Sequence, residues 1–416
     1  MSKENKKDLL RLITAGSVDD GKSTLIGRLL YDTKSIFEDQ LESVSVASTK
    51  KGNEQIDLSM FTDGLRDERA LGITIDVAYK YFSTANRKFI LADTPGHYEF
   101  TRNMITGAST SSLVLLLIDA RNGIVEQTKR HAYLSSLIRL PNILVCINKM
   151  DLVGYDQKVY DAIVEQFNDF SSAFSTNNVT FIPISALKGD NVVKRSSSMP
   201  WYTGAALLAT LETIPNRVTE SNSPVRMPVQ LSINDPINSE IRIAGRLASG
   251  TLRVGDEISI LPSRKSSKIK AIYLHGEKLN AAHSPMSIAI SLNDKLDVKR
   301  GCIISALENS AQACKELDLM LCWLMDQPLE INKDYLIKYG TSNVTGKISS
   351  VEYKIDVNNA KKIYKQRNIS MNDIARVQLS LSEELIVDKY QDNKTTGSLI
   401  VIDIDNCKTL AAGMIL

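Results

Sequence analysis

Residues 16–23 read Gly16-Ser17-Val18-Asp19-Asp20-Gly21-Lys22-Ser23. This is the pattern G-x-x-x-x-G-K-[ST] of a phosphate-binding loop, in which backbone N–H groups and the lysine hold nucleotide phosphates. The apolar run 9–15 before it predicts a buried strand, and residues 24–30 after it have helical spacing. Strand, loop and helix in this order are the context that the motif requires. The sequence therefore predicts a triphosphate site, with Lys22 at the β- and γ-phosphates and Ser23 on Mg²⁺.

The composition is that of an ordinary soluble globular protein. The chain has 416 residues, of which 43% are hydrophobic and 24% charged, so two or three domains are expected. The net charge of +2 gives no general argument for nucleic-acid binding, and we expect no nucleic-acid partner. The N-terminus has no apolar signal-peptide core, and the run 113–118 is too short for a membrane helix. We expect a cytoplasmic protein with no membrane partner.

The five cysteines form no C-x-x-C pair, and the four histidines are scattered. This spacing argues against a disulfide framework or a zinc site. We interpret the cysteines mostly as small core residues.

The first half alternates apolar runs with helical stretches. Residues 89–92, 113–118, 143–147 and 179–184 are nearly all apolar, as expected for strands buried on both faces of a mostly parallel α/β sheet. A polar residue follows each run, namely Asp93, Asp119, Asn148 and Ser185. Ligands of such sheets bind beyond the carboxyl ends of the strands. We therefore expect these polar groups to converge on one site.

The second half has a different pattern. Prolines, asparagines and serines after about residue 214 indicate a linker, and short strand-like runs with frequent turns follow it. Two small all-β barrels or sandwiches are the natural interpretation. We predict a P-loop nucleotide-binding domain over residues 1–220 and β-barrel domains over 224–308 and 311–416.

Asp93-Thr94-Pro95-Gly96 follows the apolar run 89–92. An aspartate at a strand end can hold Mg²⁺ through water. Gly96 can bring a backbone N–H close to a γ-phosphate because it has no side chain. Asp93 is thus predicted as a metal-site residue beside Ser23.

Asn148-Lys149-Met150-Asp151 follows a later strand and predicts the base. The Asp151 carboxylate can accept hydrogen bonds from N1–H and the 2-amino group of guanine, a pair that adenine lacks. We expect Asn148 to bridge to the phosphate loop and the Lys149 stem to cover the base. Ser185-Ala186-Leu187 follows the next strand, where the Ala186 N–H can reach guanine O6.

Two further residues are candidates for sensing and cleaving the γ-phosphate. Thr74, in Gly72-Ile73-Thr74-Ile75-Asp76, would bind Mg²⁺ through its hydroxyl in a loop ordered by triphosphate, although an ordinary charged loop explains the segment equally well. His97 could orient the attacking water or be a solvent-facing histidine. His131, His275 and His283 lack such a context, and we expect them to be structural or exposed.

The segment 340–348 reads Gly-Thr-Ser-Asn-Val-Thr-Gly-Lys-Ile and imitates a second phosphate loop. Its glycines are one residue too far apart, and Ile348 replaces the required Ser or Thr. We interpret it as a β turn.

Together these motifs resemble the translational GTPases of the elongation factor Tu superfamily, and residues 245–256 look like that superfamily's second-domain barrel motif. The resemblance implies a GTPase domain followed by two β-barrels. Asp20 stands where elongation factors usually carry His. With the segments 23–34, 75–82, 101–110 and 181–192, it is similar to one branch, the large GTP-binding subunit of bacterial sulfate adenylyltransferase.

This narrower resemblance implies the function. GTP hydrolysis on this chain would drive ATP and sulfate to adenosine 5′-phosphosulfate and pyrophosphate on a smaller catalytic partner. No adenylylsulfate kinase activity is expected, because the chain ends after the third domain without a second phosphate loop. Leu71 and Tyr98 depart from the branch's usual Gln and Glu beside the switches, where they bear on hydrolysis rather than on nucleotide binding. The rival interpretations are a translation factor that acts on tRNA or the ribosome and a stand-alone regulatory GTPase.

The predicted cofactors are GTP and Mg²⁺. The predicted catalytic residues are Lys22, Thr74 and His97, and the predicted metal-site residues are Ser23, Thr74 and Asp93. The predicted GTP-binding residues are Gly16, Ser17, Val18, Asp19, Asp20, Gly21, Lys22, Ser23, Thr24, Asp93, Thr94, Pro95, Gly96, His97, Asn148, Lys149, Met150, Asp151, Ser185, Ala186 and Leu187.

Overall fold

The computed structural model describes residues 7–36, 38–39, 41–42, 44, 57–61, 76–97, 101–174, 178–215, 223–234, 240–307, 311–366 and 368–416. They form two compact units. The first falls within residues 1–217 and also takes in the short segment 356–361. The second comprises the described residues of 218–355 and 362–416.

The first unit is built on a six-stranded sheet in the order β2-β3-β1-β4-β5-β6. All neighbouring strands are parallel except β2 and β3. The strands are β1 (Asp8–Ala15), β2 (Ala78–Ser83), β3 (Arg87–Asp93), β4 (Leu113–Asp119), β5 (Asn142–Asn148) and β6 (Asn178–Pro183). Every residue of the central strands β4 and β5 is buried, which explains their nearly continuous apolar sequence. The mostly parallel sheet expected from the sequence is confirmed.

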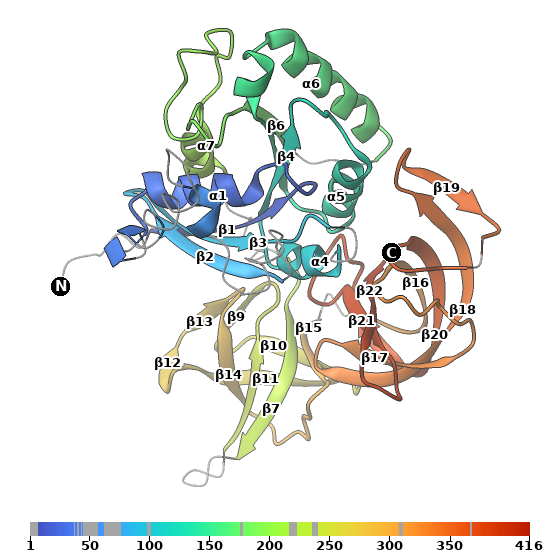
Figure 1. Ribbon diagram of the computed structural model, residues 1–416. Coiled ribbons are helices and arrows are strands. Elements are labelled where there is room, and N and C mark those ends of the chain that lie inside the picture. Colours follow the sequence, from blue (N-terminus) through green and yellow to red (C-terminus); the bar gives the residue numbers. More distant parts are fainter. Residues whose placement is uncertain are drawn as a thin grey trace. The chain divides into compact units, whose positions relative to one another are not determined.

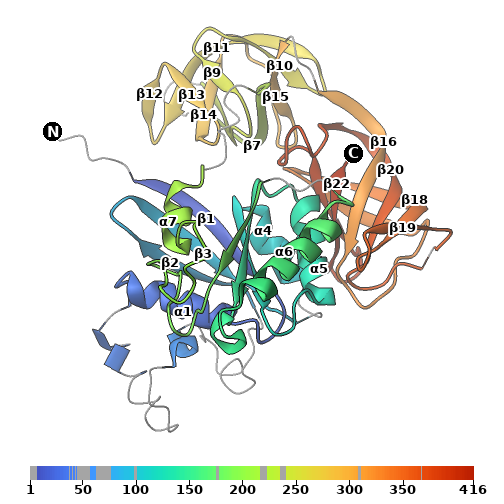
Figure 2. The same ribbon diagram turned by 90° about the horizontal axis from the view of Figure 1, so that it is seen from above.

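Helices cover both faces of this sheet (Figures 1 and 2). They are α1 (Lys22–Asp32), α4 (Thr101–Ser109), α5 (Glu126–Leu137), α6 (Gln157–Ser171) and α7 (Leu207–Thr213), with the short 3₁₀ helices η1 (Leu58–Phe61) and η3 (Met150–Val153). Leucines of α1 and α7 share one core cluster with Leu10 and Leu12 of β1. Gly107 of α4 lies against Ile13, whose side chain points to the opposite face. The alternation along β1 thus places helices on each side.

The second unit contains two antiparallel barrels. In the first, the described strands β10-β15-β7-β8-β14-β11 close into a ring through the pairing of β10 with β11. Its strands, with the accessory ones, are β7 (Arg226–Asn234), β8 (Ile241–Arg246), β9 (Thr251–Arg253), β10 (Glu257–Leu261), β11 (Lys265–Leu274), β12 (Glu277–Leu279), β13 (Ala281–His283), β14 (Ser287–Leu292) and β15 (Ile303–Ala306). Val254-Gly255-Asp256 forms the turn between β9 and β10.

The second barrel closes through the pairing of β17 with β18, in the order β17-β21-β22-β16-β20-β18. Its strands are β16 (Gln312–Trp323), β17 (Asp334–Tyr339), β18 (Ser342–Asp356), β19 (Lys361–Tyr364), β20 (Ile374–Val387), β21 (Ser398–Ile402) and β22 (Thr409–Ile415). Leu261 and Ile303 of the first barrel join the core cluster of the second. Both predicted barrels are therefore present.

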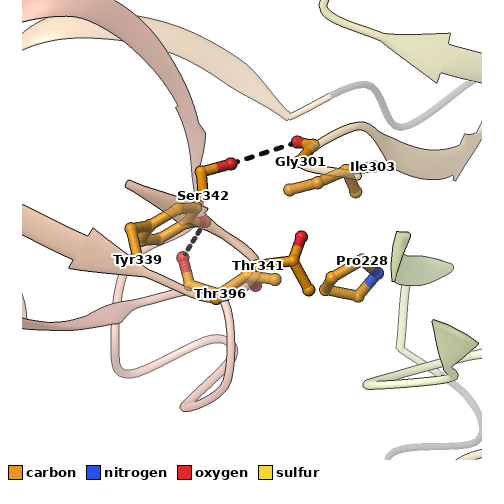
Figure 3. A pocket seen from close by; sticks show the side chains of 8 residues that line it. Pro228, Gly301, Ile303, Tyr339, Thr341, Ser342 and Thr396 are labelled. Carbon is orange, nitrogen blue, oxygen red and sulfur yellow. Dashed lines mark hydrogen bonds between the residues drawn. The ribbon is translucent and has the colours of Figure 1, made fainter. Parts of the chain in front are cut away.

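A buried ion pair joins the barrels. Arg226 Nε lies 2.9 Å from Asp388 Oδ2, and its Nη2 lies 2.9 Å from Asp388 Oδ1. Beside this pair is a small pocket lined by residues of both barrels (Figure 3). The Ser342 hydroxyl crosses it to the Gly301 carbonyl over 3.3 Å. The barrels are thus held together by polar bonds as well as by shared core residues.

The segment 340–348 is not a phosphate loop. Gly340 lies in the turn between β17 and β18 with φ of 51°, and Gly346 pairs with Tyr335 inside the β17–β18 ladder. The expected β turn is present at Gly340 and Thr341, and residues 342–348 belong to β18. The assignment of the cysteines mostly to the core is confirmed. Cys146 and Cys322 are buried, Cys302 and Cys314 are partly buried and pack against the barrel cores, and Cys407 alone of the five is exposed. None of the helices that the structure describes combines the length and the apolar character needed to cross a membrane.

We predict that Asp388→Asn destabilises the barrel unit by about 3 kcal/mol, because it leaves the buried Arg226 guanidinium without its charge partner. The measurement is chemical denaturation followed by Trp323 fluorescence in a Trp201→Phe background, since these are the two tryptophans of the chain. Asp297→Asn is the matched control, because Asp297 and its partner Lys299 are 72% and 76% exposed. Equal denaturation midpoints for the two variants would contradict the assigned role of the Arg226–Asp388 pair.

Candidate nucleotide site

The loop between β1 and α1 is shaped by close contacts that require glycine. Gly21 precedes α1 with φ of 92°, and a Cβ atom there would lie 2.3 Å from Asn148 Nδ2. Such a backbone conformation is open to glycine at little cost and strained for other residues. The second glycine of the motif is thus required by the side chain that packs against it.

Inside the loop, side chains hold the backbone in a closed turn. The Ser17 N–H donates to Asp20 Oδ2 over 2.5 Å, and Lys22 Nζ donates to the carbonyls of Ser17 and Gly16 over 2.6 and 3.2 Å. Burial lowers the pKa of Lys22, against the opposite effects of Asp20 and Asp93. Burial also raises the pKa of the Asp20 carboxyl, and Lys22 counteracts this. The loop therefore concentrates a buried cation where phosphates are expected.

His131 of α5, which was expected to be structural or exposed, is buried against the loop. Its Nδ1 accepts a hydrogen bond from the Gly16 N–H over 3.0 Å. Burial, with Lys22 and Arg130 nearby, lowers the pKa of His131 to about 3, so the imidazole is neutral at physiological pH. Because Nδ1 accepts, the ring proton of the neutral imidazole is on Nε2.

The end of β3 lies next to the loop. Thr14 Oγ1 donates to Asp93 Oδ1 over 3.0 Å, and Thr94 Oγ1 donates to the Thr14 carbonyl over 2.5 Å. A Cβ atom on Gly96 would lie 2.4 Å from Lys22 Nζ. The structure thus brings the segment 93–96 to the predicted phosphate site.

Mg²⁺ would be held by the hydroxyl of Ser23, at the start of α1, and through water by the buried carboxylate of Asp93. Hydroxyl and carboxylate oxygens are the ligands that this hard cation prefers, so the residues present fit it. The third predicted ligand, Thr74, lies outside the described residues, as do Leu71 and Tyr98.

Asn148 connects three parts of the site. Its Nδ2 donates to the Asp20 carbonyl over 2.8 Å, which is the bridge expected from the sequence. Its Oδ1 accepts from the Ala186 N–H over 2.9 Å. This is the N–H that the sequence predicts at guanine O6. A role for Ala186 at O6 stays a prediction.

The other residues of the motif 148–151 each have different surroundings. Lys149 Nζ donates to the Asp19 carbonyl of the loop and lies 2.9 Å from Asp119 Oδ2. The Asp151 side chain is 7% exposed and faces Lys188 across 4.0 Å. Met150 is buried in the core. The Asp151 carboxylate is the group of this motif that can accept hydrogen bonds from the N–H groups of a base.

Three residues that position the site were not among the predicted site residues. Arg28 of α1 donates to the carbonyls of Ala186 and Leu187, His131 holds Gly16, and Asp119 pairs with Lys149. Asp119 alone carried a signal, as one of the polar residues at strand ends. For Arg28 and His131 the sequence gives no hint, because their partners lie over a hundred positions away.

The remaining predicted residues range from exposed to fully buried. Val18, Asp19 and His97 are exposed, Ser17, Ser23 and Thr24 are partly buried, and Ser185 is fully buried. Pro95 is buried beside Gly96, and Leu187 is 51% exposed. A cation and backbone N–H groups lie at one end of the arrangement and a carboxylate at the other, which suits a nucleotide with a guanine base.

Comparison with known families agrees with this arrangement. Residues 7–221 match the family described as the elongation factor Tu GTP binding domain. Residues 316–416 match the GTP-eEF1A C-terminal domain-like family. The first match covers the unit that carries the phosphate loop, and the second covers the second barrel.

Individual relatives match along nearly the whole chain. It is 46% identical over 98% of its length to the "Bifunctional enzyme CysN/CysC" of Mycobacterium tuberculosis, of which it covers 67%. It is 44% identical to "Sulfate adenylyltransferase subunit 1" of Cellvibrio japonicus and 45% identical to that of Bacteroides fragilis, covering 88% and 87% of them. The chain is therefore a GTP-binding protein of the elongation factor Tu superfamily and belongs to the sulfate adenylyltransferase subunit 1 family.

Proposed function

We propose that this chain is the GTP-hydrolysing subunit of a sulfate adenylyltransferase. GTP and water would give GDP and phosphate here, while ATP and sulfate give adenosine 5′-phosphosulfate and pyrophosphate on a smaller catalytic partner. One observation carries the first half, namely that Asn148 joins the phosphate loop to the guanine motif. The subunit 1 relatives, matched over the full chain, support the second half.

The residues of this chain would divide the work of hydrolysis. Lys22 and the loop N–H groups bind and neutralise the phosphates. The Gly96 N–H donates a hydrogen bond to the γ-phosphate. Asp151 selects guanine, and His97 orients the water that attacks the γ-phosphorus as the bond to the bridging oxygen breaks. Mg²⁺, held by Ser23, Asp93 and Thr74, would supply charge neutralisation when bound.

The coupling to a partner follows from energetics. A mixed phosphoric–sulfuric anhydride is a high-energy product, so its formation needs a second, favourable reaction. The name "subunit 1" implies another subunit in the relatives. We infer a heterodimer or larger assembly with a small ATP-binding subunit. No adenylylsulfate kinase activity is proposed for this chain, since segment 340–348 lies in a β hairpin.

The coupling is tested by affinity capture followed by a GTPase assay. A small ATP-binding protein should be recovered with the chain, and GTP turnover of the pair should rise when both ATP and sulfate are added. Omitting sulfate is the matched control. Recovery of tRNA or ribosomes, with turnover indifferent to sulfate, would sink the assignment in favour of a translation factor.

Asp151→Asn should weaken GTP binding by about 10- to 100-fold and improve binding of xanthosine triphosphate, because the amide donates where the carboxylate accepted. Titration with both nucleotides measures the change. Asp156→Asn is the control, since Asp156 caps α6 and asparagine caps a helix equally well. Unchanged base preference in Asp151→Asn would refute the guanine assignment.

His97→Ala should lower the GTP hydrolysis rate by about 100-fold or more while leaving the GTP dissociation constant unchanged, as expected for a residue that acts on the water. Single-turnover hydrolysis and equilibrium binding separate the two effects. His283→Ala removes an exposed histidine of the first barrel and should change neither. If His97→Ala hydrolyses GTP at the unmodified rate, His97 is only a solvent-exposed residue.

A further inference from the structure

Asp119 is a buried carboxylate that the proposed chemistry does not yet use. It ends β4, and the parallel register places it beside Asn148, the last residue of β5. Its side chain is 1% exposed. A buried carboxylate is retained at a position only when cations or N–H groups satisfy it. The partners of Asp119 therefore indicate what it does.

Two cations share this carboxylate. Arg121 donates from Nε to Oδ1 over 3.0 Å and from Nη2 to Oδ2 over 2.6 Å. Lys149 Nζ approaches Oδ2 to 2.9 Å from the guanine motif. Burial would raise the pKa of Asp119, but these hydrogen bonds outweigh it and keep the pKa well below its usual range. The carboxylate is ionised and holds Lys149 from one side.

Lys149 is also fixed from two other directions. Its backbone has φ of 63°, in the left-handed region that costs a residue with a side chain about 1–2 kcal/mol. Its ammonium donates to the Asp19 carbonyl of the phosphate loop. A strained backbone of this kind persists when its surroundings hold it in place. Asp119 and Asp19 together restrict the lysine to one position between the base motif and the loop.

We propose that Asp119 is a positioning residue for guanine-nucleotide binding, which acts by holding Lys149 against the phosphate loop and beside the base. The inference rests on the proposed GTP-binding role of residues 148–151. Arg121, whose side chain is 47% exposed, covers the carboxylate from the solvent side. Asp119 would act on the base end of the nucleotide, away from the γ-phosphate.

A merely structural role has to be distinguished, because the Arg121 backbone N–H also donates to Asp119 Oδ1 over 3.0 Å. Asparagine at position 119 keeps an oxygen for this turn and removes the charge that holds Lys149. Asp119→Asn is therefore the informative variant. Asp119→Ser, which keeps a smaller oxygen acceptor, repeats the test if the asparagine variant does not fold.

The experiment measures the dissociation rates of ribose-labelled fluorescent GDP and GTP from the whole chain. Asp119→Asn should raise both rates by about tenfold and by the same factor, since the lost interaction lies at the base end. In a Lys149→Met background the same substitution should change neither rate by more than about twofold, because its target is already gone. Asp403→Asn, a buried carboxylate of the second barrel paired with Lys333, is the control and should leave both rates unaltered.

Several outcomes would overturn the inference. Unchanged rates in folded Asp119→Asn would remove Asp119 from the site, and an undiminished tenfold effect in the Lys149→Met background would show that it acts on the fold and not through Lys149. Both results leave GTP binding intact. A different result, that the unmodified chain binds neither GDP nor GTP, would contradict the proposed function itself.

Discussion

The nucleotide site depends on the side chain of Asn148. Its amide donates to the Asp20 carbonyl of the phosphate loop and accepts from the Ala186 N–H, so one residue at the end of β5 ties together loops after β1 and β6. Asn148 is 2% exposed, and an unsatisfied buried amide would cost about 1–3 kcal/mol. Both of its hydrogen bonds must therefore form together, which fixes the spacing between phosphate end and base end.

Several other residues are arranged around the two hydrogen bonds of Asn148. Gly21 has no side chain, because a Cβ atom would collide with the Asn148 amide. Lys149 reaches the loop at Asp19, one residue before the carbonyl that Asn148 contacts, and Asp119 holds it there. Arg28 of α1 holds the loop 185–187 in place by donating hydrogen bonds to the carbonyls of Ala186 and Leu187. The loop that binds phosphate and the loops that surround the base are thus one connected polar structure at one edge of the sheet.

Much of this could be predicted from the sequence, because local patterns encode it. Fully apolar runs marked β4 and β5, and parallel strands bring their carboxyl ends to one edge, so Asp119 and Asn148 had to meet. Hydrogen bonds between residues that only the tertiary fold brings together have no local sequence pattern that could predict them. His131 accepts from the Gly16 N–H across 115 positions, and the Ala186 N–H donates to Asn148 across 38 positions. Thr74 falls outside the described residues, so its role remains a prediction.

We propose that these polar residues together form one site for a guanine nucleotide. The most direct measurement is calorimetric titration of the purified chain with GTP, GDP and ATP under identical salt and Mg²⁺. GTP and GDP should bind, and ATP should bind at least about 100-fold more weakly, because adenine leaves the Asp151 carboxylate without its hydrogen-bond donors. Equal affinity for ATP and GTP, or no binding of either, would contradict it.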